Sequence, residues 1–239
     1  MTRQIIRVTG QDRVDFLQGL VTNDVTRAPC WAAMLTPQGK YLADFLIVPK
    51  GEALLLDVDA GLADDLVKRL SMYKLRSKVE LQPVDMTVAR GTGEAPEGAI
   101  QDPRHPALGW RHYGAEGDDG TDWDAIRVAH CIPKTLVELI PNETFILEAG
   151  FERLHGVDFH KGCYVGQEVT ARMKHKAELR KGLTTLRVEG EAPVGTPITA
   201  DGRAVGTLYT QSGGRGIAHV RFDRLADGME AGEARLFPE

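Results

Sequence analysis

The sequence predicts an α+β protein with two parts, a mixed body at residues 1–181 and a small β domain at residues 182–239. Within the body, strand-like runs and an amphipathic helix follow one another, and the order strand, helix, strand is typical of a helix packed on a sheet. After Gly182, short strand-like runs alternate with tight-turn pairs such as Asp201-Gly202, which is typical of a small β-barrel or sandwich. The body is expected to carry an insert at about residues 49–112.

The first elements follow from local patterns. Residues 3–8 are apolar and extended, which predicts a strand that ends at Gly10. Asp12 is a suitable cap for the helix that comes next. Residues 31–34 and 41–48 are strand-like and flank the turn-forming residues 36–40, which predicts a β-hairpin.

A third strand is expected at residues 53–58. Leu62, Leu66 and Leu70 then recur every four residues between charged positions, which predicts an amphipathic helix. The chain returns as a strand at residues 75–81. Further along, helices are predicted from Trp123 to about His130 and from Gln167 to Lys174, and short strands after Gly182 at 183–188, 197–200, 204–210, 216–221 and 234–237.

Composition excludes several classes of protein. The chain has 239 residues, of which 42% are hydrophobic and 26% charged, as in an ordinary globular protein with a sizeable core. A net charge of −5 argues against a general nucleic-acid binder. No apolar run reaches the roughly 20 residues that span a bilayer, and the N-terminus lacks a signal-peptide core. We therefore expect a cytoplasmic protein without a direct nucleic-acid or membrane partner.

Cysteine chemistry is concentrated at one position. Cys163 lies between Gly162 and Gly166, next to Lys161 and just ahead of the helix that begins at Gln167. A cationic neighbour and a helix N-terminus both lower the pKa of a thiol, so we expect Cys163 to be reactive or ligating. The alternative is a small residue in a glycine turn with a buried, inert sulfur. Cys30 and Cys131 are far away in sequence, and three cysteines cannot supply the four thiolates of a cluster, so any iron–sulfur centre must be shared or transient.

The run from Lys161 to Glu168, Lys-Gly-Cys-Tyr-Val-Gly-Gln-Glu, closely resembles the signature of the YgfZ family. Members of this family are folate-binding relatives of the T-protein of the glycine cleavage system and are implicated in iron–sulfur cluster maturation. Its motif residues here are Lys161, Gly162, Cys163, Tyr164, Gly166, Gln167 and Glu168. Further matches follow in order at residues 13–25, in the hairpin at Pro37, Gly39, Lys40 and Asp44, at Tyr73, Arg76 and Lys78, and at Asp102-Pro103-Arg104. The resemblance implies a T-protein-like folate-binding fold with a C-terminal β-barrel.

The resemblance also implies a ligand, tetrahydrofolate or a derivative. Its expected contacts are Trp123, Asp44, Tyr73 and Arg172. T-proteins tend to carry paired acids in the hairpin, whereas this chain has Ala43-Asp44, and this departure puts aminomethyl transfer in doubt. The cationic run from Arg172 to Arg187 favours an anionic ligand, either folate or an acidic partner surface. Cys131 stands where the family usually has glycine.

Three functions are compatible with the sequence. The favoured one is an accessory factor for iron–sulfur cluster assembly or repair, in which Cys163 supplies one ligand to a transient [2Fe–2S] cluster. Its partners would be a scaffold or carrier protein and client iron–sulfur enzymes, including tRNA-modifying ones. The second is a tetrahydrofolate-dependent one-carbon transferase. The third is a cysteine-nucleophile enzyme, which needs a base close to Cys163.

Overall fold

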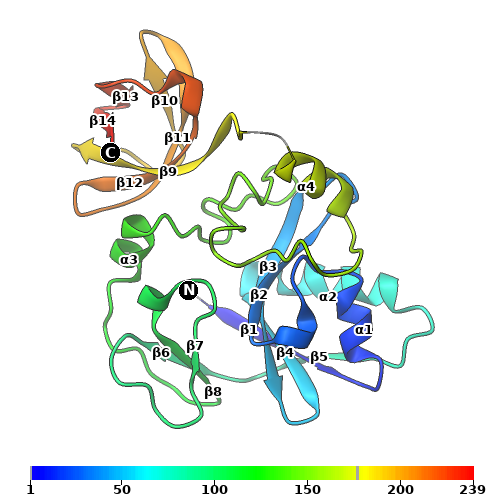
Figure 1. The fold of residues 1–239 in the computed structure, drawn as a ribbon. Coiled ribbons are helices and arrows are strands. Elements are labelled where there is room, and N and C mark those ends of the chain that lie inside the picture. The colour runs from blue at the N-terminus through cyan, green and yellow to red at the C-terminus, as the bar shows by residue number, and fades with distance from the viewer. Residues whose placement is uncertain (1, 176–177) are drawn as a thin grey trace. The chain divides into compact units, whose positions relative to one another are not determined.

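The computed structural model describes residues 2–175 and 178–239, and the chain divides into two compact units (Figure 1). The first unit comprises residues 1–121, 141–143 and 151–171. The second comprises residues 122–140, 144–150 and 172–239, so the barrel shares its unit with segments that precede residue 182 in the sequence.

The first unit is built on a five-stranded antiparallel sheet of order β2-β3-β4-β1-β5. Its strands are β1 (Arg3–Thr9), β2 (Cys30–Leu35), β3 (Tyr41–Lys50), β4 (Ala53–Asp59) and β5 (Glu80–Val84). The predicted hairpin is confirmed as β2–β3, and its turn is closed by hydrogen bonds from the Thr36 amide to the Lys40 carbonyl and from the Gly39 amide to the Thr36 carbonyl. β4 and β5 lie within the expected insert, yet both pair with β1, so that prediction must be corrected: the main sheet continues through the segment.

Helix α2 (Ala60–Lys74) covers this sheet, as the leucine periodicity predicts. The Asp59 carboxylate accepts a hydrogen bond from the Gly61 amide at 2.9 Å and so caps the helix N-terminus. Leu62, Leu66 and Leu70 are buried against the strands. The helix ends at Leu75, whose φ of 41° cannot continue an α-helix.

Helix α1 (Arg13–Gln18) has six residues. Asp12 occupies the N-cap position but makes no side-chain cap bond, so its predicted capping role is wrong. Its carboxylate instead accepts a hydrogen bond from the Lys78 amide at 2.7 Å. Asp12 therefore fastens the start of α1 to the segment that follows α2.

A second, three-stranded sheet of order β6-β8-β7 completes the first unit. Its strands are β6 (Val88–Gly91), β7 (Ile100–Gln101) and β8 (Trp110–Tyr113), and the short helix η2 (Pro106–Leu108) leads into β8. Helix α4 (Gln167–Lys174) has the limits that the sequence predicts.

The second unit contains a closed six-stranded barrel of order β10-β11-β12-β9-β14-β13, which confirms the predicted barrel. Its strands are β9 (Lys181–Glu189), β10 (Thr196–Ala200), β11 (Arg203–Ser212), β12 (Arg215–Arg221), β13 (Met229–Ala231) and β14 (Ala234–Pro238), with helix η3 (Phe222–Arg224) after β12. Alternating apolar side chains such as Leu186, Ile198 and Leu208 fill the barrel interior. Helix α3 (Trp123–Ala129) packs on β11 and β12. None of the helices in the described residues is both long and apolar enough to cross a membrane.

Candidate functional site

The signature loop, residues 160–166, is anchored at its end by a close approach of two glycines. Gly166 has a φ of 85°, and a Cβ atom there would lie 2.6 Å from the Thr36 carbonyl oxygen and 3.2 Å from the Gly39 Cα atom. Gly39 lies in the β2–β3 turn with a φ of 74°. Both the conformation and the space therefore require glycine at position 166. Gly162 is different, because no atom lies within 4 Å of a Cβ placed there.

The other end of the signature loop is held by Lys161. Its side chain is buried, and Nζ donates hydrogen bonds to the carbonyl oxygens of Gln18 at 2.8 Å and Val21 at 2.5 Å. Nζ also lies 5.1 Å from the centre of the Tyr164 ring. Burial lowers the pKa of Lys161 to about 8. The position of Lys161 in the motif predicts that its cation acts on the Cys163 thiol, whereas in the structure it fixes the loop to the end of α1.

Cys163 is exposed at the middle of the signature loop, so the alternative of a buried, inert sulfur does not apply to it. Cys30 is buried, and this burial raises the pKa of its thiol to about 12. Cys131 is half-buried. In the described part of the chain, no three His, Cys, Asp or Glu side chains gather as a metal site. Cys163 is therefore the exposed thiol among the three cysteines, and within the described residues it is not part of a cluster of three potential metal ligands.

The remaining signature residues support the loop. Tyr164 is buried, which raises its pKa to about 12. Gln167 begins α4, and Glu168 adds a carboxylate to its first turn, where the helix dipole favours negative charge. These residues shape the setting of Cys163, whose sulfur is exposed.

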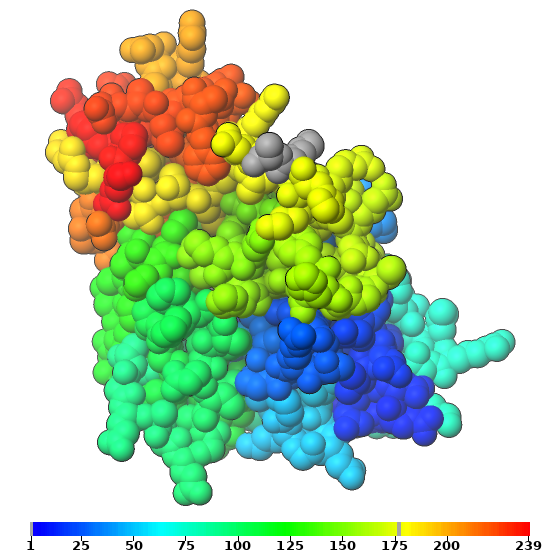
Figure 2. Space-filling view, viewed as in Figure 1, coloured from blue at the N-terminus to red at the C-terminus, as the bar shows by residue number. Residues whose placement is uncertain are grey.

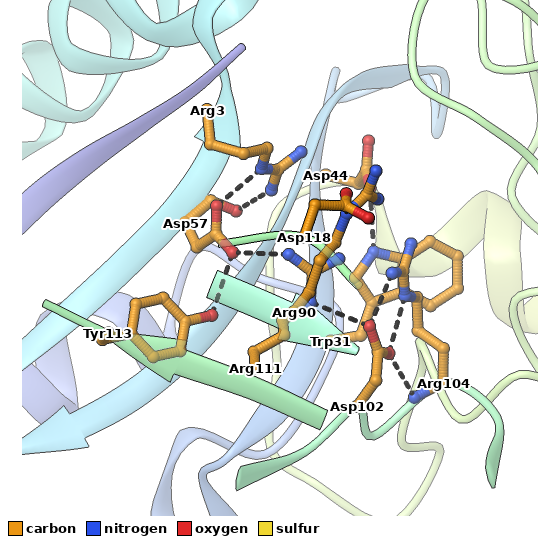
Figure 3. Close-up of polar contacts among 10 residues, drawn as sticks. All are labelled: Arg3, Trp31, Asp44, Asp57, Arg90, Asp102, Arg104, Arg111, Tyr113 and Asp118. Atoms are coloured by element: carbon orange, nitrogen blue, oxygen red, sulfur yellow. Dashed lines mark hydrogen bonds and ion pairs between the residues drawn. The ribbon is translucent and has the colours of Figure 1, made fainter. Parts of the chain in front are cut away.

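Among the residues expected to contact folate, Asp44 is buried in a hydrogen-bonded cluster. Its carboxylate accepts hydrogen bonds from Trp31 Nε1 at 2.8 Å (Figure 3) and from the Tyr41 hydroxyl at 2.7 Å. The Trp31 ring stacks on Phe151 with a centroid distance of 3.9 Å. Asp44 is thus held in the protein interior, and Trp31 orients its carboxylate. The sequence did not indicate this role of Trp31, because the residue lies in a run that predicts only a strand.

The other expected folate contacts are dispersed. Tyr73 is 40% exposed at the C-terminal end of α2, in the first unit with Asp44. Trp123 is the first residue of α3 and is half-buried, and Arg172 is exposed on α4; both belong to the second unit. The structure does not bring the four residues together within either unit.

A buried charge network is the largest polar feature that the sequence did not predict. Arg111 on β8 donates to Asp57 at 3.1 Å and to Asp102 at 2.9 Å (Figure 3). Arg3 pairs with Asp57, and Arg104 pairs with Asp102. Burial by itself would raise the pKa of both carboxyl groups, but the paired arginines outweigh it and hold both pKa values below their usual range. The network joins the three-stranded sheet to the main sheet.

Comparison with known proteins gives a consistent result. Residues 180–239 match the family described as "CAF17, C-terminal beta-barrel domain". The chain is 31% identical to the iron-sulfur cluster assembly factor IBA57 of Mus musculus, over 93% of this chain and 76% of that protein. The chain belongs to the CAF17/IBA57 family. The homologous factor of Homo sapiens is 30% identical, with the same coverage of each chain.

Family membership confirms the sequence resemblance at the level of the family, since YgfZ is a related bacterial member; the relatives found carry the name IBA57. The solved structure of aminomethyltransferase T from Bartonella henselae is similar, with a TM-score of 0.71 over 98% of this chain and 81% of that one. At 13% identity this likeness concerns the fold alone, and it confirms the predicted T-protein-like fold.

The predicted cytoplasmic location is wrong on this comparison. The mouse and human relatives are both named as mitochondrial proteins, and so is the IBA57 homolog of Mycosarcoma maydis, which is 31% identical over 96% of this chain and 65% of its own length. These names place the three relatives in mitochondria and point away from a cytoplasmic location. The amino-acid composition gave no indication of a mitochondrial location.

Proposed function

We propose that this protein is an accessory factor for iron–sulfur cluster assembly or repair, and that Cys163 is the residue through which it acts. Support comes from relatives named as iron-sulfur cluster assembly factors. The single observation that carries the residue assignment is exposure: Cys163 is exposed, whereas Cys30 is buried and Cys131 is half-buried. A cluster is cargo in this scheme, and a scaffold or carrier protein supplies its other ligands. Client iron–sulfur enzymes, including tRNA-modifying ones, would receive it.

The loop geometry suits such a transfer. Lys161 and Gly166 fix the two ends of the signature loop, so Cys163 is presented from a short span with defined ends. Thiolate bonds to iron can then form and break at one exposed sulfur without rearrangement of the core. A cysteine nucleophile would instead need a base and an orienting group, and the described residues show no hydrogen bond between Cys163 and a histidine.

The test is to mix the purified protein with a scaffold protein loaded with a [2Fe–2S] cluster and to record visible absorption and circular dichroism. We expect a changed cluster spectrum with the wild type and with Cys131→Ala, and no change with Cys163→Ala. In cells that lack the native gene, Cys163→Ala should likewise fail to restore iron–sulfur enzyme activity. Full restoration by Cys163→Ala together with failure of Cys131→Ala would show that the wrong cysteine was chosen.

We further propose that the protein binds a reduced folate without consuming it. The proposal rests on the family resemblance, on Trp123 and on the cationic residues that begin at Arg172. Asp44 fits this role less well, because both of its carboxylate oxygens already accept hydrogen bonds from buried partners. Titration with tetrahydrofolate should quench tryptophan fluorescence saturably, and Trp123→Phe should reduce the quenching. Steady production of methylenetetrahydrofolate from an aminomethyl donor would instead favour the one-carbon transferase.

A further inference from the structure

The end of α2 exposes an unusual group of apolar side chains. We call residues 68–78 the α2 tip. Within it, Leu75 is 89% exposed, Met72 66% and Tyr73 40%. The positive φ of Leu75 is uncommon for a residue with a branched side chain and ends the helix with this side chain in solvent. In the space-filling view, the turquoise segment at this end of α2 stands out from the surface (Figure 2). Contiguous exposed apolar surface usually marks an interaction site, and these three side chains fall within four consecutive residues.

The α2 tip carries a net positive charge, whereas the whole chain carries a net negative one. It contains five cationic residues and no acidic one, although the chain carries a net charge of −5; the cations are Lys68, Arg69, Lys74, Arg76 and Lys78. Tyrosine, methionine and arginine are the residue types enriched at the centre of protein interfaces. Surrounding lysines attract an acidic partner and set its orientation.

Helix α1 connects the α2 tip with the signature loop. At its N-terminal end, the Asp12 carboxylate accepts the hydrogen bond from the Lys78 amide. At its C-terminal end, the Gln18 carbonyl accepts the hydrogen bond from Lys161. Because α1 has six residues, its axis is about 9 Å long. The α2 tip and the signature loop therefore lie at the two ends of one short helix. A single partner can cover both, since an interface of standard size buries about 800 Å² on each protein.

From this arrangement we propose that the α2 tip is the docking surface for the protein that shares a cluster with Cys163. The partner is an acidic scaffold or carrier with an apolar groove for Met72 and Leu75. It would lie across α1 so that its own ligands meet Cys163. This inference rests on the proposed function, and it moves the expected acidic contact from the run after Arg172 to the α2 tip. Three exposed apolar side chains within four residues present a small apolar area, which suits a protein groove better than a lipid surface, where a helix buries a broad apolar face.

The experiment measures binding of the wild type and of variants to a [2Fe–2S]-loaded scaffold protein by calorimetry. We expect Met72→Ser/Leu75→Ser and Lys74→Glu/Arg76→Glu to weaken binding at least tenfold. Val194→Ser changes an apolar residue of the second unit that is 60% exposed, and it should bind like the wild type. All of these sites are on the surface, so the thermal unfolding midpoints should be unchanged. Carbodiimide coupling, which joins an amine to a carboxylate only at contact, should link Lys74 or Lys78 to the scaffold.

Two results would overturn the inference while leaving the proposed function intact. One is normal scaffold binding by both tip variants, with loss of binding in Lys174→Glu. The other is binding of the protein to phosphatidylglycerol vesicles that the tip variants abolish while scaffold binding is unchanged, which would assign the α2 tip to a membrane surface. If the wild type neither binds the scaffold nor alters its cluster spectrum, the proposed function fails and the docking surface fails with it.

Discussion

Gly166 of the signature loop packs against Gly39 of the β2–β3 turn so closely that a Cβ atom on Gly166 would lie 3.2 Å from the Gly39 Cα atom. It would also lie 2.6 Å from the Thr36 carbonyl oxygen, and φ at Gly166 is 85°. Gly166→Ala should therefore lower the free energy of unfolding by about 2–4 kcal/mol, through a backbone clash and left-handed strain. Urea unfolding measures this change. Gly162→Ala is the control, with an expected change within about 0.5 kcal/mol; equal effects of the two substitutions would contradict the packing.

Arg111 forms ion pairs with two buried carboxylates, those of Asp57 and Asp102. Arg111→Met should lower the free energy of unfolding by about 3–5 kcal/mol, because it leaves buried charges unpaired. The folded-state pKa values of both carboxyl groups are depressed, so the stability they contribute is present above their ordinary pKa near 4 and is lost as the pH falls. Urea unfolding from pH 7 to pH 3 should show a steeper loss for the wild type than for Arg111→Met.

Arg90→Met is the matched control for this network. Arg90 pairs with Asp118 at 3.2 Å, but both side chains are partly exposed, so the expected loss is below about 1 kcal/mol. A similar loss in the two variants would mean that burial of the Arg111 pairs contributes nothing.

Because of Lys161, the free energy of unfolding should change with pH in the alkaline range. Its folded-state pKa of about 8 lies below the ordinary value of 10.5, so between these values the unfolded chain binds more protons than the folded one. Stability therefore rises with pH through this window. The free energy of unfolding of the wild type, relative to Lys161→Met, should increase by about 2 kcal/mol from pH 8 to pH 10.5. A flat or falling difference would show that the ammonium is not desolvated by the fold.

Cys131 occupies a position that suits glycine. It follows the last turn of α3 with a φ of 49°, and its amide donates to the Val128 carbonyl while the Ile132 amide donates to the Arg127 carbonyl. This is a Schellman motif, in which glycine is preferred because it has no Cβ. Cys131→Gly should raise the free energy of unfolding, measured by urea unfolding, by about 0.5–1 kcal/mol, and Cys131→Ala should give no such gain. A destabilising Cys131→Gly would indicate that the sulfur makes an important contact.

Local pattern was sufficient wherever one element is specified by its own residues. The leucine period at 62, 66 and 70 marks the buried face of α2, because a helix repeats every 3.6 residues whatever it packs on. Alternating strands joined by glycine turns predicted the barrel, and the run from Gln167 to Lys174 predicted α4. The string around Cys163 also pointed to the family without a structure. Each of these signals is carried by neighbouring residues of one element, one hairpin or one motif.

Partners that come from distant parts of the chain were decided only by the tertiary structure. Lys161 is two residues from Cys163 in the signature loop, yet its ammonium donates hydrogen bonds to the carbonyl oxygens of Gln18 and Val21. A buried ammonium is stabilised by whatever acceptors the fold places beside it. Likewise Asp12 has the sequence of a helix cap, but the Lys78 amide comes within reach and takes its carboxylate. The exposure that distinguishes Cys163 from Cys30 depends on the neighbours of each sulfur in space. By itself the sequence determined the β2–β3 hairpin, α2, α4 and the barrel, and it marked the family motif around Cys163, whereas the three-stranded sheet and the limits of β5 were decided by the tertiary structure. Side-chain contacts were likewise decided by packing, since hydrogen-bond and charge partners are set by proximity after folding.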